Sequence, residues 1–370
     1  MTDPIPAPAT FAPATGHTTD VEYAVTHRIG RVRLNRPRAV NSLTTAMCES
    51  MLVQLTQWAA DETVGAVFID GAGDKGLCAG GDVRALRELI LAGDEAAAMR
   101  FWELEYALNA LIADYPKPYV AWMDGVVMGG GVGISAHGSQ RLVTQRAMVA
   151  MPETIIGFFP DVGGLYHLAH APGELGTHVA LTGLTVGPAD AVLLGLADGV
   201  VAVADKAKVL ADLATALGEV IVESDEPDAT DGSAAEEPQV APRSELESQR
   251  GWIDECYAGD DAAAILERLR GYADPAANAA GEVLAARSPH SVAITLAAIR
   301  RARDMDVHEV LAQDAVLCRR FVSHPDFVEG VRALLVDKDN APAWVDASVA
   351  EIAPAEVRAA FGDGAPVTHR

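Results

Sequence analysis

The chain has 370 residues, of which half are hydrophobic and 5% aromatic, a composition typical of a globular protein with a sizeable core. Its formal net charge is −24. This excess of acids argues against a nucleic-acid or acidic-membrane partner, because both require a basic surface. Any anionic ligand must therefore be held by local groups.

The cysteines and the amino terminus bear on the cell compartment. Cys48, Cys78, Cys256 and Cys318 lie far apart and form no C-x-x-C pair, so they predict neither a disulfide framework nor a zinc site. The amino terminus lacks a basic start followed by an apolar block, and no stretch approaches the roughly 20 apolar residues that span a bilayer. We therefore expect reduced thiols, a cytoplasmic location and no membrane segment.

Strand, glycine turn and helix alternate over the first part of the chain. Strand patterns cover residues 21–37, 64–73 and 117–128. Helical patterns cover residues 42–61, 82–93 and 96–115. Ser42 and Thr44 are candidate caps of the first helix, and Asp82 is the candidate cap of the second. This alternation predicts an α/β fold.

The composition divides the chain into five parts. Residues 223–237 contain seven acids and no base, which is typical of a solvated, disordered insert. The later patterns, 251–273, 277–289, 290–305 and 309–323, are helical. The predicted parts are a disordered lead (1–20), an α/β core (21–217), an acidic insert (218–248), a helical carboxy-terminal region (249–352) and a tail (353–370).

Two glycine-rich turns could bind a developing oxyanion. In "GLCAGGDVR", residues 76–84, small residues leave backbone N–H groups bare just before a helix. In "MDGVVMGGGVGISAHG", residues 123–138, a strand runs into three glycines and a short helix. The alternative for the first segment is a tight turn whose helix Asp82 caps.

Two other chemistries are weaker. Gly131, Gly133 and Ala136 match the dinucleotide fingerprint G-x-G-x-x-A, but a dinucleotide fold needs a longer helix than this segment allows. Ser135 and His137 are close in sequence, yet "GISAHG" is not the G-x-S-x-G turn of a serine hydrolase.

The segment "MPETIIGFFPDVGG", residues 151–164, carries Glu153 and Asp161 in an apolar run. Either acid alone could be a helix cap. Their coincidence with two oxyanion-capable turns, and with no serine or cysteine nucleophile motif, favours another role. A desolvated carboxylate has a raised pKa and can serve as acid, base or nucleophile, so acyl chemistry is indicated.

Four segments in order resemble the crotonase, or enoyl-CoA hydratase/isomerase, superfamily from about Val21 to Ile352. They are "LNRPRAVNSLTTAM", "GLCAGGDVRAL", "KPYVAWMDGVVMGGGVGISAHG" and "MPETIIGFFPDVGG". The resemblance implies a crotonase-like spiral of repeated ββα units with a mostly helical carboxy-terminal region. Those helices would cover the site or mediate assembly into a homo-oligomer, a trimer or a multiple of one.

Within the superfamily, "FPDVGG", "GISAHG" and "EGVRALLVDKDNAPAW" resemble the 3-hydroxyisobutyryl-CoA hydrolases. This implies a thioesterase of valine breakdown, with coenzyme A as part of the substrate and no separate cofactor or metal. By matched position, the N–H groups of Gly81 and Gly130 would form the oxyanion hole and Glu153 would be the catalytic carboxylate. Glu105 and Asp161 would contact the 3-hydroxyl group and the attacking water.

One departure separates the chain from a hydratase. Hydratases carry two catalytic glutamates, and the first of these positions matches Gly133 here. An enoyl-CoA hydratase or isomerase, and a non-catalytic acyl-CoA-binding protein, remain as alternatives. Because coenzyme A is anionic, we also expect a local basic rim near the first two motifs, drawn from Arg36, Arg38, Lys75, Arg84 and Arg87.

Overall fold

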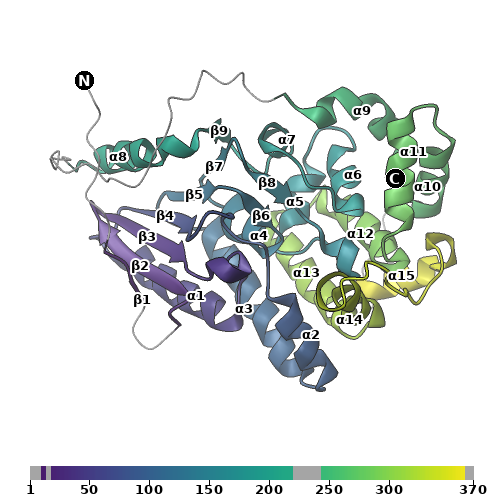
Figure 1. Cartoon of the computed structure of the whole chain (residues 1–370), viewed down its shortest axis with the longest axis horizontal. Coiled ribbons are helices and arrows are strands. Elements are labelled where there is room, and N and C mark those ends of the chain that lie inside the picture. Colours follow the sequence, from purple (N-terminus) through teal and green to yellow (C-terminus); the bar gives the residue numbers. More distant parts are fainter. Residues whose placement is uncertain (1–9, 14–17, 220–242, 363–370) are drawn as a thin grey trace.

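The computed structural model describes residues 10–13, 18–219 and 243–362. The strands gather at one end of this part of the chain, and most helices after residue 243 gather at the other (Figure 1). The strands are β1(Ala12–Pro13), β2(Val21–Thr26), β3(Ile29–Leu34), β4(Ala66–Gly71), β5(Tyr119–Met123), β6(Val126–Met128), β7(Gln140–Thr144), β8(Met148–Ala150) and β9(Gly199–Val201).

Helices occupy most of the remaining described residues. The first eight are α1(Thr45–Ala60), α2(Val83–Leu91), α3(Glu95–Ala113), α4(Gly130–Ala136), α5(Gly164–Ala169), α6(Leu175–Thr182), α7(Pro188–Leu193) and α8(Lys206–Ala216). The others are α9(Glu245–Cys256), α10(Ala262–Gly271), α11(Pro275–Ala285), α12(Pro289–Ala302), α13(Val307–Val322), α14(Pro325–Val331) and α15(Pro354–Ala360). Short helical turns are η1(Pro37–Ala39), η2(Glu153–Ile156), η3(Val203–Asp205), η4(Arg332–Val336) and η5(Val349–Glu351).

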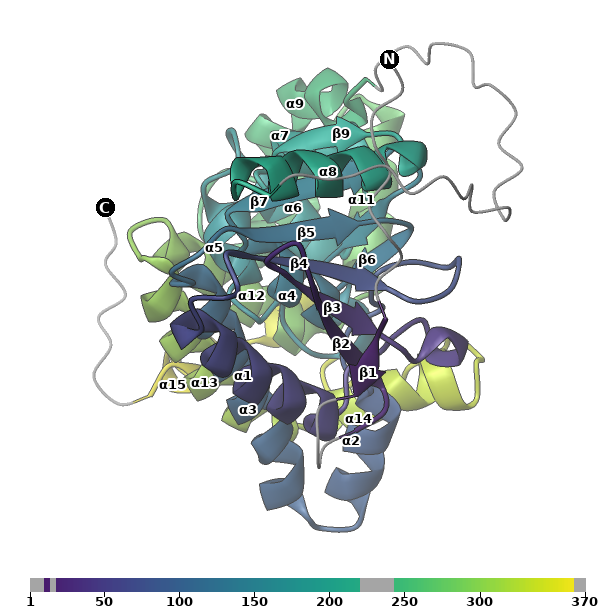
Figure 2. The same cartoon turned by 90° about the vertical axis from the view of Figure 1, so that its left-hand side faces the viewer.

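The two sheets explain the spiral. The large sheet has the order β1-β2-β3-β4-β5-β7-β9 (Figure 2) and is parallel from β3 onward. Strands β6 and β8 pair as a small parallel sheet. The chain passes from β5 in the large sheet to β6 in the small one and then into α4. It repeats the step from β7 to β8. Each turn therefore ends a small-sheet strand just before a helical segment.

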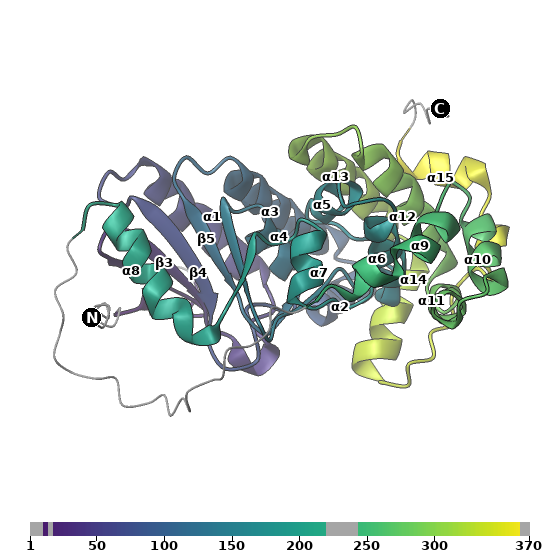
Figure 3. The same cartoon turned by 90° about the horizontal axis from the view of Figure 1, so that it is seen from above.

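Successive side chains of the large sheet pack alternately into two separate hydrophobic cores. Val67 and Ile69 face the main core, which they share with α1 and α3. Phe68 and Trp122 face the other way, against Leu210 of α8. Because successive residues of a strand point to opposite faces, α8 covers one face of the sheet while α1 and α3 cover the other (Figure 3).

The helix starts and one strand differ in detail from the sequence expectations. The hydroxyl of Thr44 and the carboxylate of Asp82 cap α1 and α2, as predicted. Ser42 is not a cap, because its hydroxyl donates to Ala39 O at 2.9 Å. The strand predicted over 117–128 divides into β5 and β6, since Gly125 adopts a φ of +52° between them and turns the chain into the second sheet.

The predicted boundaries stay predictions. Ala12–Pro13 pairs with β2, within the lead predicted to lack structure, and α9 begins at Glu245, within the range predicted for the insert. The acidic run 223–237 and the last eight residues lie outside the described residues. None of the described helices is long and apolar enough to cross a membrane.

Candidate active site

The two glycine turns lie side by side. Cys78, after β4, donates its N–H to Val126 O at 3.1 Å, and Met128 N–H donates to Cys78 O at 2.9 Å. These bonds extend the small sheet and bring the turn before α2 against the turn before α4. Gly129 combines a φ of +51° with a ψ of −119°, a backbone conformation that strongly favours glycine.

The N–H groups of Gly81 and Gly130 are available for a ligand. Within the described part of the chain, neither amide has a hydrogen-bond acceptor. A Cβ placed on Gly130 would lie 3.4 Å from Gly81 N, so the two amides belong to one small region. Two unpaired N–H donors on neighbouring turns are the arrangement that stabilises a tetrahedral oxyanion. The structure thus brings together the two glycines that the resemblance implied.

Glu153 and Glu105 face the second of these turns. Glu153 Oε1 would lie 2.8 Å from a Cβ on Gly129, and Glu105 Oε1 would lie 2.3 Å from a Cβ on Gly130. Glu153 is in η2 and Glu105 in α3, and both are buried. Among the described residues, Glu153 Oε2 and Glu105 Oε1 have no hydrogen-bond partner. Buried polar atoms are normally paired, so these oxygens indicate a site for water or substrate.

Asp161 completes the group of acids. Its side chain is 5% exposed, and the Tyr106 hydroxyl donates to Asp161 Oδ2 at 2.7 Å. Tyr106 follows Glu105 in α3, so this one helix holds both a carboxylate at the glycine turn and the hydrogen-bond donor to Asp161. No sequence motif marks Tyr106 as a site residue.

Burial dominates the electrostatics of the acids. Desolvation, with a smaller contribution from the charge of Asp161, raises the pKa of Glu105 and that of Glu153 well above their usual value. Desolvation also raises the pKa of Asp161 to about 7, against the opposing effect of the Tyr106 hydrogen bond. Like charges so close do not all ionise together, so at neutral pH the group holds at least one proton.

The raised pKa of Asp161 predicts that Asp161→Asn stabilises the protein at high pH. The pKa is 3.8 in the unfolded chain and about 7 in the folded protein, so ionisation above pH 4 progressively destabilises the folded state. This interval corresponds to on the order of 4 kcal/mol. The substituted amide does not titrate, so the melting temperature of this variant should exceed that of the wild type by several degrees at pH 8 and by much less at pH 4.5.

Thermal unfolding of both proteins across this pH range measures the effect. Exposed Asp304 offers a matched control, since Asp304→Asn removes the same charge outside the site. Equal behaviour of the two variants at every pH would contradict the assigned burial of the Asp161 charge.

The space next to the Gly133 backbone, where a side chain would extend, is occupied by other residues. A Cβ on this residue would lie 2.7 Å from Val162 Cβ and 2.8 Å from Asn109 Nδ2. Both distances are shorter than Cβ atoms tolerate, so no side chain fits without displacing its neighbours. Val162 and Asn109 thus close the position that the resemblance matches to a hydratase glutamate.

The two weaker chemistries find no support in the geometry. The hydroxyl of Ser135 is buried and donates to Gly131 O at 2.7 Å, while His137 Nε2 lies 2.7 Å from Val162 O. Serine and histidine are thus engaged with different backbone carbonyls. Helix α4 has 7 residues, which is too short for the helix of a dinucleotide-binding crossover.

Two further buried residues lie at the site. Asn109 follows Glu105 by one helical turn, so a shared buried face could have been inferred from the sequence. Asp314, in α13, accepts a hydrogen bond from Gly163 N–H at 2.8 Å across 151 residues of sequence. No local pattern announces such a contact. The carboxy-terminal helices therefore reach the site itself.

The predicted basic rim is partly engaged elsewhere. Arg36 donates to Asp82, and Arg84 and Arg87 donate to the carbonyls of Leu335 and Val328. Arg38 and Lys75 are exposed. Coenzyme A binding by this rim stays a prediction.

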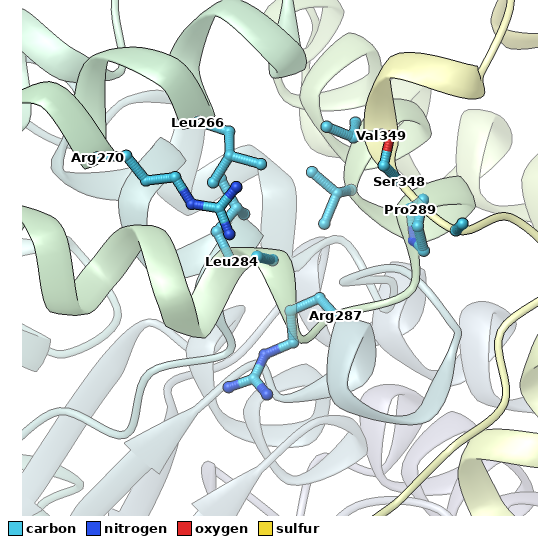
Figure 4. Close-up of a pocket in the computed structure, with 10 residues that line it drawn as sticks. Leu266, Arg270, Leu284, Arg287, Pro289, Ser348 and Val349 are labelled. Atoms are coloured by element: carbon cyan, nitrogen blue, oxygen red, sulfur yellow. The ribbon is translucent and has the colours of Figure 1, made fainter.

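A separate cavity of about 170 Å³ lies among α10, α11, α12 and η5 (Figure 4). Arg270 at its edge donates to Glu282 Oε1 at 2.9 Å, and Arg287 donates to Thr182 O at 2.8 Å. None of the five predicted site residues lines it. The cavity is distinct from the group of acids.

A sequence profile described as enoyl-CoA hydratase/isomerase matches residues 29–361. The chain belongs to this family. The predicted crotonase resemblance and α/β fold are confirmed, and the match spans β3 to β9 and the carboxy-terminal helices. Membership of the family is consistent with an acyl-CoA substrate. It does not identify the reaction, which depends on the residues of the candidate active site.

Two curated relatives carry the same name. The chain is 37% identical over 338 residues to "3-hydroxyisobutyryl-CoA hydrolase, mitochondrial" of Danio rerio, covering 90% of this chain and 87% of that protein. It is 36% identical over 326 residues to the human protein of the same name, covering 87% and 83%.

Solved structures of the family carry other descriptions. A carnitinyl-CoA dehydratase from Mycobacterium thermoresistibile is 44% identical, with a TM-score of 0.82 and coverage of 95% of this chain and 97% of that one. An enoyl-CoA hydratase from Rhodobacter sphaeroides 2.4.1 is 36% identical, with a TM-score of 0.84 and coverage of 93% and 97%. These family members thus bear the names of three reactions.

Proposed function

We propose that this chain is a thioesterase that hydrolyses 3-hydroxyisobutyryl-CoA, and also 3-hydroxypropionyl-CoA, to the free 3-hydroxy acid and coenzyme A. The name of the curated relatives supports the substrate. The observation that supports hydrolysis over hydration is the lack of space for a side chain at Gly133. Without a second glutamate there, Glu153 faces the oxyanion turns without the partner that hydration uses.

The proposed reaction begins at the thioester carbonyl. Its oxygen lies between the N–H groups of Gly81 and Gly130, where the developing negative charge is stabilised. A Glu153 oxygen attacks the carbon, the carbon–sulfur bond breaks, and the thiolate leaves and takes up a proton. Water then splits the mixed anhydride and restores Glu153. In the alternative route Glu153 takes a proton from water, and that water oxygen attacks the carbonyl carbon directly.

Asp161 and Glu105 are proposed to orient the other reactants. The second Asp161 oxygen, beyond the one that Tyr106 holds, can accept from the 3-hydroxyl group or from water. Glu105 lies against Gly130 and can contact the acyl group next to the oxyanion. The reaction needs no cofactor, because coenzyme A arrives as part of the substrate and water is the second reactant.

A hydratase or dehydratase is the second candidate, favoured by the descriptions of the two solved structures. Thiol release decides between the candidates, because only hydrolysis frees the coenzyme A thiol. We expect release from 3-hydroxyisobutyryl- and 3-hydroxypropionyl-CoA to exceed release from 3-hydroxybutyryl- and acetyl-CoA. With crotonyl-CoA and carnitinyl-CoA we expect no change in double-bond absorbance.

A chain that hydrated or dehydrated these substrates without freeing thiol would refute the proposal. A chain that bound acyl-CoA but changed none of the panel would be a non-catalytic binding protein. Glu153→Gln distinguishes true turnover from a contaminating thioesterase.

Two properties of the protein in the cell also remain proposals. We propose a cytoplasmic location, for which the free cysteines support only a reducing compartment, whereas the curated relatives are named mitochondrial. Homo-oligomers, as trimers or multiples of them, are proposed from the superfamily resemblance. Sedimentation of the purified chain tests the second point.

A further inference from the structure

The residue after Asp161 has a strained backbone. Val162 has a φ of +53° and is fully buried. A β-branched residue rarely adopts this left-handed conformation, which costs on the order of 1–3 kcal/mol and persists only where the surroundings impose it. Relaxation of Val162 would rotate the adjoining peptides and move Asp161 away from Tyr106.

One hydrogen bond reaches this peptide from the end of the oxyanion helix. His137 is the C-cap of α4, and its Nε2 lies 2.7 Å from Val162 O. A carbonyl oxygen only accepts, so His137 Nε2 must carry the proton. His137 Nδ1 is then an acceptor, and His167 Nε2–H can donate to it at 3.2 Å.

Both imidazoles are half-buried, and their desolvation keeps them neutral. Desolvation lowers the pKa of His137 to about 4, and desolvation with the charge of His137 lowers that of His167 well below its usual value. Arg141 and His308 are the other basic groups that disfavour a proton on His137. The donor at Nε2 is therefore retained through the neutral pH range.

A second hydrogen bond reaches the same peptide from the carboxy-terminal helices. The N–H of Gly163 belongs to the peptide unit whose carbonyl His137 binds, and it donates to Asp314 Oδ2 at 2.8 Å. A Cβ on Gly163 would lie 2.8 Å from His137 Cε1, so only glycine lets the ring approach this closely. Both polar groups of the Val162–Gly163 peptide are thus held by side chains, one from half-buried His137 at the end of α4 and one from fully buried Asp314 in α13.

We infer that His137 and Asp314 are positioning residues, which clamp the strained Val162–Gly163 peptide and so hold Asp161 in register with the oxyanion turns. The inference rests on the proposed function for its kinetic consequence. His137 links Asp161 to the helix that begins at Gly130, so one rigid element carries both the oxyanion donor and the clamp. His167 sets the proton position on His137.

The test compares variants that keep or remove each hydrogen bond. His137→Gln keeps an N–H donor and Asp314→Asn keeps an oxygen acceptor, whereas His137→Phe and Asp314→Leu remove them. With 3-hydroxyisobutyryl-CoA we expect at least a tenfold loss of kcat in the Phe and Leu variants, with KM within about threefold of the wild type. The Gln and Asn variants should stay within about threefold in kcat.

The double variant His137→Phe/Asp314→Leu should lose no more than the worse single variant, because the two residues act on one peptide. His170→Gln, on an exposed histidine of the same segment, is the control and should match the wild type. Wild-type kcat in the Phe variant, or a Gln variant as slow as the Phe variant, would overturn the clamp.

Measurements that need no catalytic turnover test this inference independently of the proposed function. Those made on the wild type also remain decisive if a variant folds poorly. In the wild type, ¹⁵N NMR should show a neutral His137 protonated at Nε2, and hydrogen exchange should show a protected Gly163 amide. Asp314→Asn should keep that protection, and Asp314→Leu should raise the exchange rate at least tenfold. Protonation of His137 at Nδ1, or an unprotected Gly163 amide, refutes the clamp even if thiol release is normal. An absence of thiol release with both signals present would refute only the thioesterase.

Discussion

Glu153→Gln is expected to lower kcat for thiol release by about 10²- to 10⁴-fold, because a positioned carboxylate contributes on this scale as a base or nucleophile. The variant should fold normally, because glutamine keeps the shape of the Glu153 side chain. It also removes a buried carboxyl group whose pKa is raised by desolvation. A steady-state assay with 3-hydroxyisobutyryl-CoA measures the loss. Full activity in this variant would refute both routes proposed for hydrolysis.

The controls for this variant are close at hand. Glu103, in the same helix as Glu105, is exposed, so Glu103→Gln should leave kcat unchanged.

For the wild type, kcat should rise with pH through an apparent pKa above the usual carboxyl value, which belongs to the interacting acids together. A single turnover in ¹⁸O water should label the Glu153 side chain if an anhydride forms and water attacks its Glu153 carbonyl carbon, and should label only the released acid if Glu153 activates water.

Gly133→Glu should destabilise the fold without creating a hydratase. The added Cβ would approach Val162 and Asn109 to under 3 Å, and the carboxylate would join a region whose acids are already desolvated. Overpacking of a core costs about 1–3 kcal/mol, and a buried unpaired charge adds to that. We expect a melting temperature lower by several degrees and no hydration of crotonyl-CoA.

Two comparisons isolate the cause. Gly251 is exposed in α9 with nothing near its Cβ position, so Gly251→Glu adds the same side chain without the overlap and should keep its melting temperature. Gly133→Ala adds only the Cβ and should lie between the wild type and Gly133→Glu. If Gly133→Glu melted with the wild type and hydrated crotonyl-CoA, Gly133 would decide the reaction by its lack of a carboxylate alone.

The sequence alone anticipated much of the fold because its signals are local. The almost continuous buried runs of β3 and β4, and caps such as Thr44, depend on neighbours within a few positions. The division of residues 117–128 into two strands was missed, since it depends on the turn at Gly125 and on pairing with β8. Ser42 was a wrong cap for a different, local reason, because its hydroxyl donates to the carbonyl of Ala39 three residues earlier.

The candidate site divides in the same way. Glu153, Asp161 and the glycine turns stood out in the sequence because buried acids and bare backbone are unusual in apolar runs. Tyr106 and Asp314 did not, because an ordinary helical residue becomes part of a site only when folding brings it to a distant loop.

The sequence by itself therefore determined the family and the carboxylate and glycine chemistry available to this protein, since these depend on residue types at short spacing. The tertiary structure decided how that chemistry is arranged. It brings the N–H groups of Gly81 and Gly130 close together on two neighbouring turns, and it fills the space at Gly133 with Val162 and Asn109. Such close approaches arise from packing between elements far apart in the chain, and no local pattern encodes them.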